Sequence, residues 1–544
     1  MTLLDNSYPV LAKGGVRRWA APLALAAITA GFFTAAIWNV GSLQFPGSNW
    51  IPGNSDICLD LGAPTSVSSV YLLIQEDKPV NVEAYSGSPE DWTLRTSLDE
   101  PGTYQQWRKI ALDSETQYIR LLFKQTYGEI GEVAVFADSR RLEVKRILDA
   151  GGREVAAPLI DEQSLVPAPP TYQNETYFDE IYFVQAAEDY LHSEDPFEWS
   201  HPPLGKFFIA LGILLFGNNP FGWRIVGVIL ATLMVPLVYM LARRLFGSPR
   251  AGLIGAFLLA VDFMHLSMAR MATGETFLVL FLLLMFYFFF RYYQGSSPRD
   301  LFLTMLCFGL AFSVKWVAMY GFVAVLILFS ILKWRSGISR AETLSLIGGL
   351  GAAAAVYLMC YIPYFLNGHS LADFAKLQVA MFNYHAGLEA SHPFAAPWWS
   401  WPLMLHPLYL YTGQVDNFSS NIFLLGNPVL WWGSIPAVLG AVWLAIRRKD
   451  KLALFIAIPF FAQWLLFIPI PRVLFIYHFY PCVLFMVLAV TLWLERLQPR
   501  WRWGVVSYLA LAAAVFLLCY PPISGMPVSQ DSWYGAGVKW LLGW

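Results

Sequence analysis

The sequence predicts a polytopic α-helical membrane protein with one β-sandwich outside the membrane, and three observations support this fold class. Of the 544 residues, 57% are hydrophobic and 14% are charged, whereas soluble domains are about 45–50% apolar. Long apolar runs alternate with short basic connections over most of the chain. Residues 41–140 differ, because there short runs of β-forming residues alternate with turn residues.

The first 40 residues are predicted to contain a cytoplasmic N-terminus and one transmembrane helix. Residues 19–40 are apolar for long enough to cross about 30 Å of hydrocarbon, and Lys13, Arg17 and Arg18 precede them. A cleaved signal peptide is the alternative, but its apolar core is shorter, at about 7–15 residues. We therefore expect an uncleaved helix with its basic flank in the cytoplasm.

Residues 41–140 show the regular short runs that are typical of a β-sandwich. Several short motifs follow one another in this segment, namely Asp60-Leu61-Gly62, Trp92, Trp107, Tyr118 to Leu121 and Ile130 to Val133. In this order they resemble the discoidin-like, galactose-binding domains. That resemblance implies contact with carbohydrate, and a spacer or docking domain is the alternative. Residues 141–176 are rich in Gly and Pro, which predicts a linker.

Ten further apolar runs give about eleven spans in total with the first helix. They are 222–242, 251–268, 274–290, 300–314, 316–332, 343–365, 427–446, 452–470, 473–494 and 503–521. Every second connection is rich in Arg and Lys, as the positive-inside rule requires of cytoplasmic connections. Residues 204–217 then cannot cross and are expected to form a juxtamembrane or re-entrant helix, on the outer side with 178–206 and 367–420.

Three connections on this outer side each contain one cation, namely Arg270, Lys315 and Arg472. Such residues can snorkel from helix ends to the headgroups. The alternative is that they converge on an anion, which is favoured by Tyr477 and His478 soon after Arg472.

Two acidic residues, Asp179 and Glu180, precede the first apolar run of this part, and His201 and Lys206 follow them. Ionisable groups near hydrocarbon are costly and therefore indicate function. Neighbours on a helix point about 100° apart, so the two carboxylates cannot both face one proton. We expect one general base and one positioning partner, and a solvated acidic turn is the alternative.

Several motifs occur in one order along the chain. They are Phe178-Asp179-Glu180, His201 to Lys206, Asn219 to Arg224, Asp262 to Arg270, Ser313 to Trp316, Trp399 to Pro402, Gly426 to Trp431 and Arg472 to Pro481. Together they resemble the dolichyl-phosphate-mannose protein mannosyltransferases, glycosyltransferase family 39 with the GT-C fold. The β-domain, and a 367–420 connection too short for the MIR domain of eukaryotic members, favour a bacterial-type member in a plasma membrane.

This resemblance implies that residues 177–544 form a GT-C catalytic domain that moves mannose from a polyprenyl or dolichyl phosphate to a Ser/Thr hydroxyl of an exported protein, with inversion. Asp179 is the expected base and Glu180 the second choice. The leaving phosphate needs positive charge, for which the candidates are Arg270, Lys206, Lys315, Arg472 and His478. The candidates for other substrate and acceptor contacts are His201, Tyr477, Trp399, Trp401, His385 and His392. For the two Trp residues, a place in the membrane interface is the alternative.

No cofactor is expected, and a divalent metal is compatible with the sequence but not indicated, since no Asp-x-Asp motif occurs. The net charge of -2 argues against nucleic acid as a partner. The five cysteines are scattered and form no disulfide framework. The expected partners are a polyprenyl-phosphate sugar, an acceptor protein and the bilayer. The alternatives are a glycolipid or cell-wall glycan as acceptor, a transporter of lipid-linked sugars, and an adhesion protein.

Overall fold

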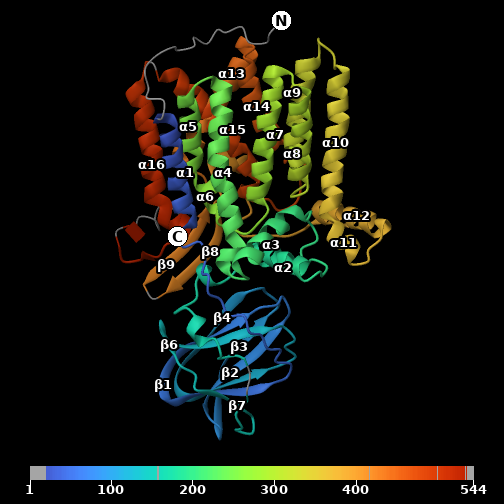
Figure 1. The fold of residues 1–544 in the computed structure, drawn as a ribbon. Coiled ribbons are helices and arrows are strands. Elements are labelled where there is room, and N and C mark those ends of the chain that lie inside the picture. The colour runs from blue at the N-terminus through green and yellow to red at the C-terminus, as the bar shows by residue number, and fades with distance from the viewer. Residues whose placement is uncertain (1–19, 156–157, 416, 499, 533, 536–544) are drawn as a thin grey trace.

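The computed structural model describes residues 20–155, 158–415, 417–498, 500–532 and 534–535. The basic residues of the predicted cytoplasmic N-terminus lie outside the described residues. A layer of long helices carries a separate β-domain at one end, with short helices and a small sheet between them (Figure 1).

Each apolar run that was predicted to span the membrane contains a helix. The helices of these runs are α1 (Ala20–Ile37), α4 (Pro220–Phe246), α5 (Pro249–Ala260), α6 (Phe263–Ala269), α7 (Glu275–Gly295), α8 (Pro298–Phe312), α9 (Ala318–Lys333), α10 (Arg340–Cys360), α13 (Pro428–Arg448), α14 (Lys451–Leu465), α15 (Tyr480–Leu497) and α16 (Arg502–Ser524). Seven helices of the described residues are long and apolar enough to cross a bilayer, and the bent pair α5–α6 raises this number to eight. The chain is therefore an integral multi-pass membrane protein.

The predicted number of about eleven spans is not reached by helix length alone. Helices α8, α9 and α14 contain 15, 16 and 15 residues, fewer than the roughly 20 that cross the hydrocarbon core. They nevertheless lie in the same layer as their longer neighbours (Figure 1). The run 300–314 is as long as α8, whereas the runs 316–332 and 452–470 are one and four residues longer than α9 and α14, because turn residues precede α9 and follow α14.

Two of the predicted spans are interrupted. Helices α5 and α6 meet at an angle of 62°, because Asp262 leaves helical conformation and its carboxylate caps α6 by accepting the His265 amide at 3.1 Å. The run 473–494 begins with a short 3₁₀ helix, η4 (Ile476–Phe479), and α15 starts only at Tyr480. His478, which falls within the predicted span 473–494, therefore lies on η4 and not on α15.

The helices begin and end where local chemistry requires it. Asn219 precedes α4 and its side chain accepts the Gly222 amide at 2.8 Å, while Pro220 occupies the first turn, where no amide donor is needed. Gly247 ends the same helix in the left-handed conformation, with φ 68°. The Asn219 cap fixes where α4 begins, at the β-domain end of the helical layer, and Gly247 fixes where it ends.

The β-domain contains one hydrogen-bonded sheet with the strand order β3-β2-β4-β1-β5-β6, and β7 pairs with β1. Its strands are β1 (Asp56–Ile74), β2 (Val80–Ser88), β3 (Asp91–Glu100), β4 (Gln106–Phe123), β5 (Ile130–Ala137), β6 (Arg140–Leu142) and β7 (Arg146–Asp149). Register shifts occur within the β1–β4 pair. Residues from both halves of β1, such as Leu59 and Leu72, enter one hydrophobic core, so the predicted β-domain is present. Its likeness to discoidin domains and its contact with carbohydrate stay predictions.

The predicted boundary at residue 140 is wrong. Strands β6 and β7 and the buried residues Val144, Ile147 and Leu159 belong to the β-domain core. Gly151 and Gly152, which helped to predict a linker, lie in the turn after β7 within this packed segment. The chain then passes two 3₁₀ helices, η1 (Gln163–Leu165) and η2 (Tyr172–Asn174), before it enters the membrane part.

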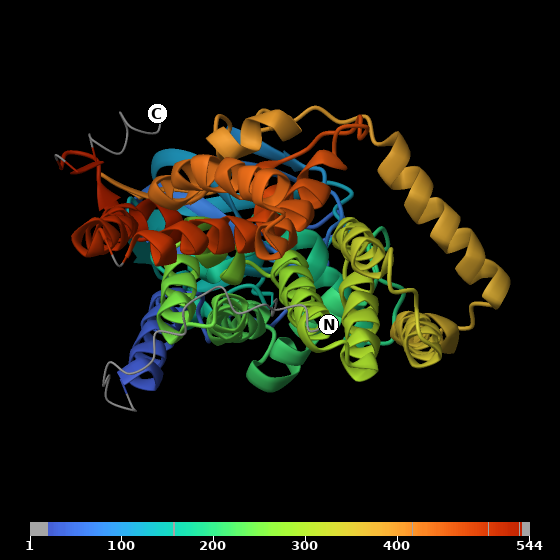
Figure 2. The ribbon, with the colours of Figure 1, turned by 90° about the horizontal axis from the view of Figure 1, so that it is seen from above.

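The remaining elements gather at the β-domain end of the helices (Figure 1). They are α2 (Glu180–Leu191), α3 (Leu204–Phe216), α11 (Ile362–Leu366), α12 (Leu371–Gly387), η3 (Trp398–Leu403), β8 (Leu408–Val415), β9 (Phe418–Leu424) and β10 (Val528–Ser529). Helix α3 packs against α2 and α4 as a short apolar helix, as predicted for a juxtamembrane element. Viewed from above, α12 lies at the rim of the molecule, apart from the packed helices (Figure 2).

Candidate functional site

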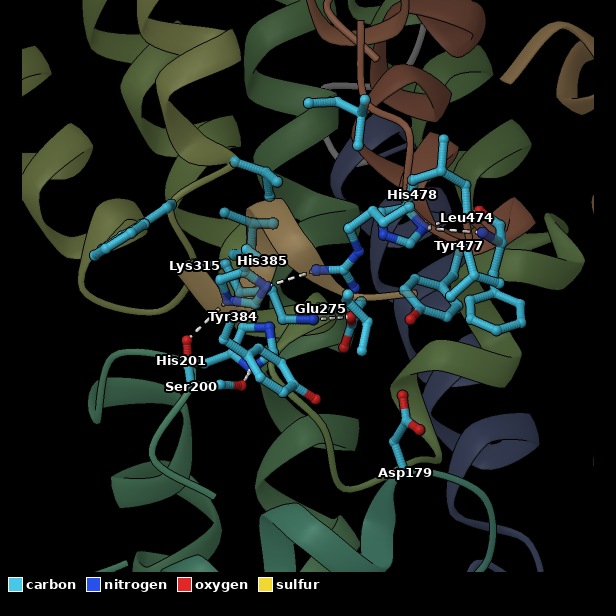
Figure 3. Close-up of a pocket in the computed structure, with 18 of the residues that line it drawn as sticks. Asp179, Ser200, His201, Glu275, Lys315, Tyr384, His385, Leu474, Tyr477 and His478 are labelled. Carbon is cyan, nitrogen blue, oxygen red and sulfur yellow. Dashed lines mark hydrogen bonds and ion pairs between the residues drawn. The ribbon is translucent and has the colours of Figure 1, made fainter. Parts of the chain in front are cut away.

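The candidate site is a cavity of about 1110 Å³ at the β-domain end of the helical layer. Segments that are far apart in the sequence line it, and several ionisable side chains point into it (Figure 3). The lining residues with titratable or polar side chains include Asp179, Glu198, Ser200, His201, Glu275, Lys315, Tyr384, His385, His392, Arg472, Tyr477 and His478.

Asp179 enters this cavity from the N-cap position, directly before α2. No side-chain hydrogen bond or ion pair holds its carboxylate among the described residues, and the backbone amide of the next turn is not capped by it. Burial raises the pKa of Asp179 to about 7, and the nearby Glu275 carboxylate adds to this against Lys315 and Arg472. The group is therefore a free carboxylate that exchanges protons near neutral pH.

Phe178, the residue before Asp179, has φ 52°, a left-handed conformation that costs a non-glycine residue about 1–2 kcal/mol. Aromatic contacts hold it there. Its ring packs edge-on against Phe475 and Tyr477, with centroids 6.1 and 6.4 Å apart, and against His392 at 6.5 Å. The turn that presents Asp179 is thus fixed by segments from the opposite end of the chain.

Arg472 is the cation in the cavity that no carboxylate neutralises among the described residues. Its guanidinium donates to Nδ1 of His385 at 2.6 Å, and Nε2 of His385 donates to the Ser200 carbonyl at 2.8 Å. Both contacts are satisfied only if His385 is neutral with its proton on Nε2, and burial lowers the pKa of His385 to about 4. Arg472 is therefore oriented without losing its charge.

Lys315 also lines the cavity, but an ion pair with Glu275 at the start of α7 neutralises it. The ammonium also lies over the rings of Phe183 and Tyr477, 5.7 and 5.8 Å from their centroids. The other oxygen of Glu275 is buried without a hydrogen-bond partner. This pair gives the cavity wall a dipole with no net charge.

Lys206 does not reach the cavity, although the sequence placed it among the phosphate ligands. Its buried ammonium binds Glu198 at 2.6 Å and the His201 carbonyl at 2.8 Å. His201 lines the cavity, and its Nδ1 lies 3.0 Å from Glu198. Lys206 and His201 hold the pKa of Glu198 well below its usual value against the effect of burial. Lys206 therefore positions the loop that presents His201.

Glu180 and Arg270 were also expected at the site, and both are wrong as cavity residues. The Glu180 carboxylate binds Arg224 at 2.7 and 2.8 Å and accepts the Ala272 amide at 2.8 Å. Arg270 donates to backbone carbonyls, which include those of Ala36 at 2.9 Å, Trp38 at 2.6 Å and Ser524 at 2.9 Å. Both groups are buried, join distant segments and do not line the cavity, so they are not available to a substrate there.

Of the aromatic and histidine candidates, some line the cavity and others do not. Tyr477, His478 and His392 line the cavity. Trp401 is completely buried behind His478, parallel to its ring at 6.0 Å, and its indole donates to the Ala396 carbonyl at 2.9 Å. Trp399 is 52% exposed and lies outside the cavity. These two Trp residues therefore do not contact a ligand in this cavity.

Sequence reasoning missed Glu275, Glu198 and Ser200. Glu275 stands at the start of an apolar run, in the same connection as Arg270, and an acidic residue there is a signal of function. Glu198 and Ser200 could not be selected from the polar loop around them. The cavity as a whole combines a free carboxylate with a free guanidinium, a set suited to deprotonating one reactant and holding an anionic partner.

Two family models match this chain. Residues 200–362 match the dolichyl-phosphate-mannose-protein mannosyltransferase model, and residues 370–544 match the C-terminal four-transmembrane region of protein O-mannosyltransferases. The polyprenol-phosphate-mannose–protein mannosyltransferase of Mycobacterium tuberculosis is 27% identical over 411 residues, which cover 61% of this chain and 79% of the relative. The Mycolicibacterium smegmatis protein of that name is 27% identical over 450 residues, or 67% and 87%.

The fold has a counterpart among solved structures. The Pmt1–Pmt2 protein O-mannosyltransferase complex of S. cerevisiae, bound to the sugar donor, superposes with a TM-score of 0.59 at 14% identity, over 68% of this chain and 89% of that chain. The two family models together cover more than half of the sequence, in its catalytic part. This chain therefore belongs to the dolichyl-phosphate-mannose–protein mannosyltransferase family.

Proposed function

We propose that this protein transfers mannose from a polyprenyl phosphate to a Ser/Thr hydroxyl of a protein, with inversion at the anomeric carbon. The observation that carries this proposal is that one cavity contains both the Asp179 carboxylate, which no side chain binds among the described residues, and the Arg472 guanidinium. The homologues named polyprenol-phosphate-mannose–protein mannosyltransferases support the choice of donor and acceptor.

Asp179 acts as the general base in this proposal. Its carboxylate takes the proton of the acceptor hydroxyl while the hydroxyl oxygen attacks the anomeric carbon from the face opposite the phosphate. A base is most effective when its pKa lies near the working pH, and the pKa of Asp179 is about 7. A single displacement of this kind inverts the anomeric centre.

Arg472 receives the leaving group. As the bond between the anomeric carbon and the phosphate oxygen breaks, its electron pair stays on the phosphate, which gains negative charge. A guanidinium can bind two phosphate oxygens at once, and a cation already in place stabilises charge as it develops. Lys315 contributes less, because Glu275 neutralises it. His478, on η4, also lines the cavity, and its imidazole can donate or accept a hydrogen bond at the phosphate.

We place the reaction on the extracytoplasmic side. Helices α4, α7, α9, α13 and α15 run away from the β-domain, so the basic residues that follow them lie at the far end of the helical layer (Figure 1). Basic connections are cytoplasmic as a rule. The cavity and the β-domain at the other end then face the compartment that exported proteins enter.

The test is transfer by the purified full-length protein in detergent or nanodiscs. The donor is a polyprenyl-phosphate mannose, and the acceptors are a Ser/Thr-rich peptide, the same peptide with Ala at each Ser/Thr, and a glycolipid. Mass spectrometry should show one added hexose on the first peptide only, in a linkage of inverted configuration. Transfer to the glycolipid alone would reject a protein acceptor, and donor hydrolysis without transfer would reject the transferase.

A further inference from the structure

Three carboxylates outside the catalytic cavity meet at the base of the β-domain. Glu132 lies on β5, and Asp161 and Glu162 lie in the segment that returns from the β-domain toward the membrane part. One oxygen of each carboxylate lies within 4.8 Å of the others. No Lys, Arg or His forms an ion pair with any of the three among the described residues. Three negative charges at this spacing repel one another unless a cation joins them.

Glu132 supplies an independent sign of a ligand. The residue is completely buried, and its Oε1 has no hydrogen-bond partner. Its Oε2 accepts only the Glu162 amide, at 3.2 Å. A buried carboxylate oxygen without a partner is costly, whereas coordination to a cation would satisfy it. The Glu132 carboxylate belongs to the same close group as those of Asp161 and Glu162.

The other two residues define a site that is closed on one side and open on the other. Glu162 is half-buried, and its Oε2 accepts the amides of Gly47 and Ser48 at 2.7 and 2.8 Å and the Ser48 hydroxyl at 2.7 Å. The Ser48 hydroxyl also lies 3.1 Å from Asp161, which is exposed. The surrounding protein therefore holds Glu132 and Glu162 in place. On the exposed side, beside Asp161, water can complete the coordination shell of an ion.

The chemistry of the three carboxylates indicates which ion they would bind. Carboxylate oxygens suit hard cations, and Ca²⁺ accepts six to eight oxygens at about 2.3–2.6 Å in flexible geometry. Two oxygens bound to one such ion lie no more than about 4.8 Å apart, and one oxygen from each of these three carboxylates meets that limit. Mg²⁺ keeps most of its water and usually binds only one or two carboxylates, so three converging carboxylates favour Ca²⁺.

We infer that Glu132, Asp161 and Glu162 bind a calcium ion, and that this ion fastens the β-domain to the chain segments that enter and leave the membrane part. The segment at Gly47 and Ser48 follows α1, and the segment at Asp161 and Glu162 leads to α2. The ion joins both segments to β5 and limits the motion of the β-domain. This site is separate from the catalytic cavity.

The experiment measures calcium binding by purified full-length protein after treatment with a chelator. Isothermal titration calorimetry should show one Ca²⁺ per chain, with a Kd of about 0.1–1 mM, as for extracellular calcium modules. Ca²⁺ should also raise the melting temperature. The Glu132→Gln and Asp161→Asn variants should each bind about tenfold more weakly or worse, because each loses a charged ligand. Glu143→Gln is the matched control, since Glu143 is exposed on the same domain and pairs only with Lys145.

Two results would overturn the inference. One is the absence of any heat or melting shift up to about 10 mM Ca²⁺, well above the weakest Kd expected of such modules; Glu132 would then be a protonated acid of the core. The other is equal binding by wild type and by Asp161→Asn. Asp161 is exposed, so this variant is expected to fold even if Glu132→Gln does not, and its loss of binding alone would support the site.

Discussion

Replacing Asp179 by Asn tests whether this carboxylate acts as the catalytic base or only supports the structure. Asn has the same shape but cannot take the acceptor proton. General-base catalysis contributes about 10²–10⁴-fold to a rate, so kcat should fall by this factor. Binding of the donor should persist, because the carboxylate bonds to no residue that holds the cavity together among the described residues.

The pH dependence follows from the pKa of Asp179, which is about 7. The base works only when it is deprotonated, so wild-type kcat/KM should fall about tenfold for each pH unit below this value and level off above it. The residual rate of Asp179→Asn should not follow this curve, because the titrating group is absent.

Stability should change in the opposite direction from activity. The folded pKa of about 7 lies above the ordinary value of 3.8, so the neutral form favours folding. This stability is fully present below pH 3.8 and is lost as the pH rises through about 7. The shift corresponds to at most about 4 kcal/mol, and water in the cavity reduces it. Asn cannot ionise, so the variant should melt higher than wild type at alkaline pH.

The assay is single-turnover transfer to a Ser/Thr peptide, with the melting temperature followed from about pH 5 to about pH 8.5. Glu194→Gln is the control, because Glu194 is an exposed carboxylate at the same end of the molecule and does not line the cavity. Near-normal kcat in Asp179→Asn would refute the base. A wild-type activity profile without a bend near neutral pH would refute the assigned pKa.

The other predictions concern three ionisable groups, one that lines the cavity and two that are bound to other parts of the protein. Arg472→Ala should lower transfer from the lipid-phosphate donor by about 10²–10³-fold, with partial rescue in Arg472→Lys; equal loss in both would contradict a role of charge. Glu180→Gln should lower the melting temperature by the equivalent of about 3–5 kcal/mol, because it leaves Arg224 buried without a counter-charge, and an inactive variant with unchanged stability would contradict this. Arg270→Ala should reduce the yield of folded protein while the folded fraction keeps the wild-type KM for donor; a raised KM at normal yield would show phosphate contact instead.

The sequence indicated the membrane fold because its signals are local. A run of apolar residues of sufficient length, and basic residues at alternate connections, act over one helix at a time. The same applies to the β-domain, whose alternating runs became β1 to β5. The boundary at residue 140 failed because the buried residues Val144 and Leu159 lie among Gly and Pro, and turn residues do not reveal whether a segment packs.

From the sequence alone it is clear that Asp179, Glu180, Arg270 and Arg472 all adjoin apolar runs. Which of these ionisable groups remain available depends on the folded arrangement of the chain. Glu180 meets Arg224 across 44 residues, and Arg270 meets Ser524 across 254. A charge in a low-dielectric environment needs a hydrogen-bond or ion-pair partner. Here the fold supplies that partner from a distant part of the chain, which no local sequence pattern can indicate.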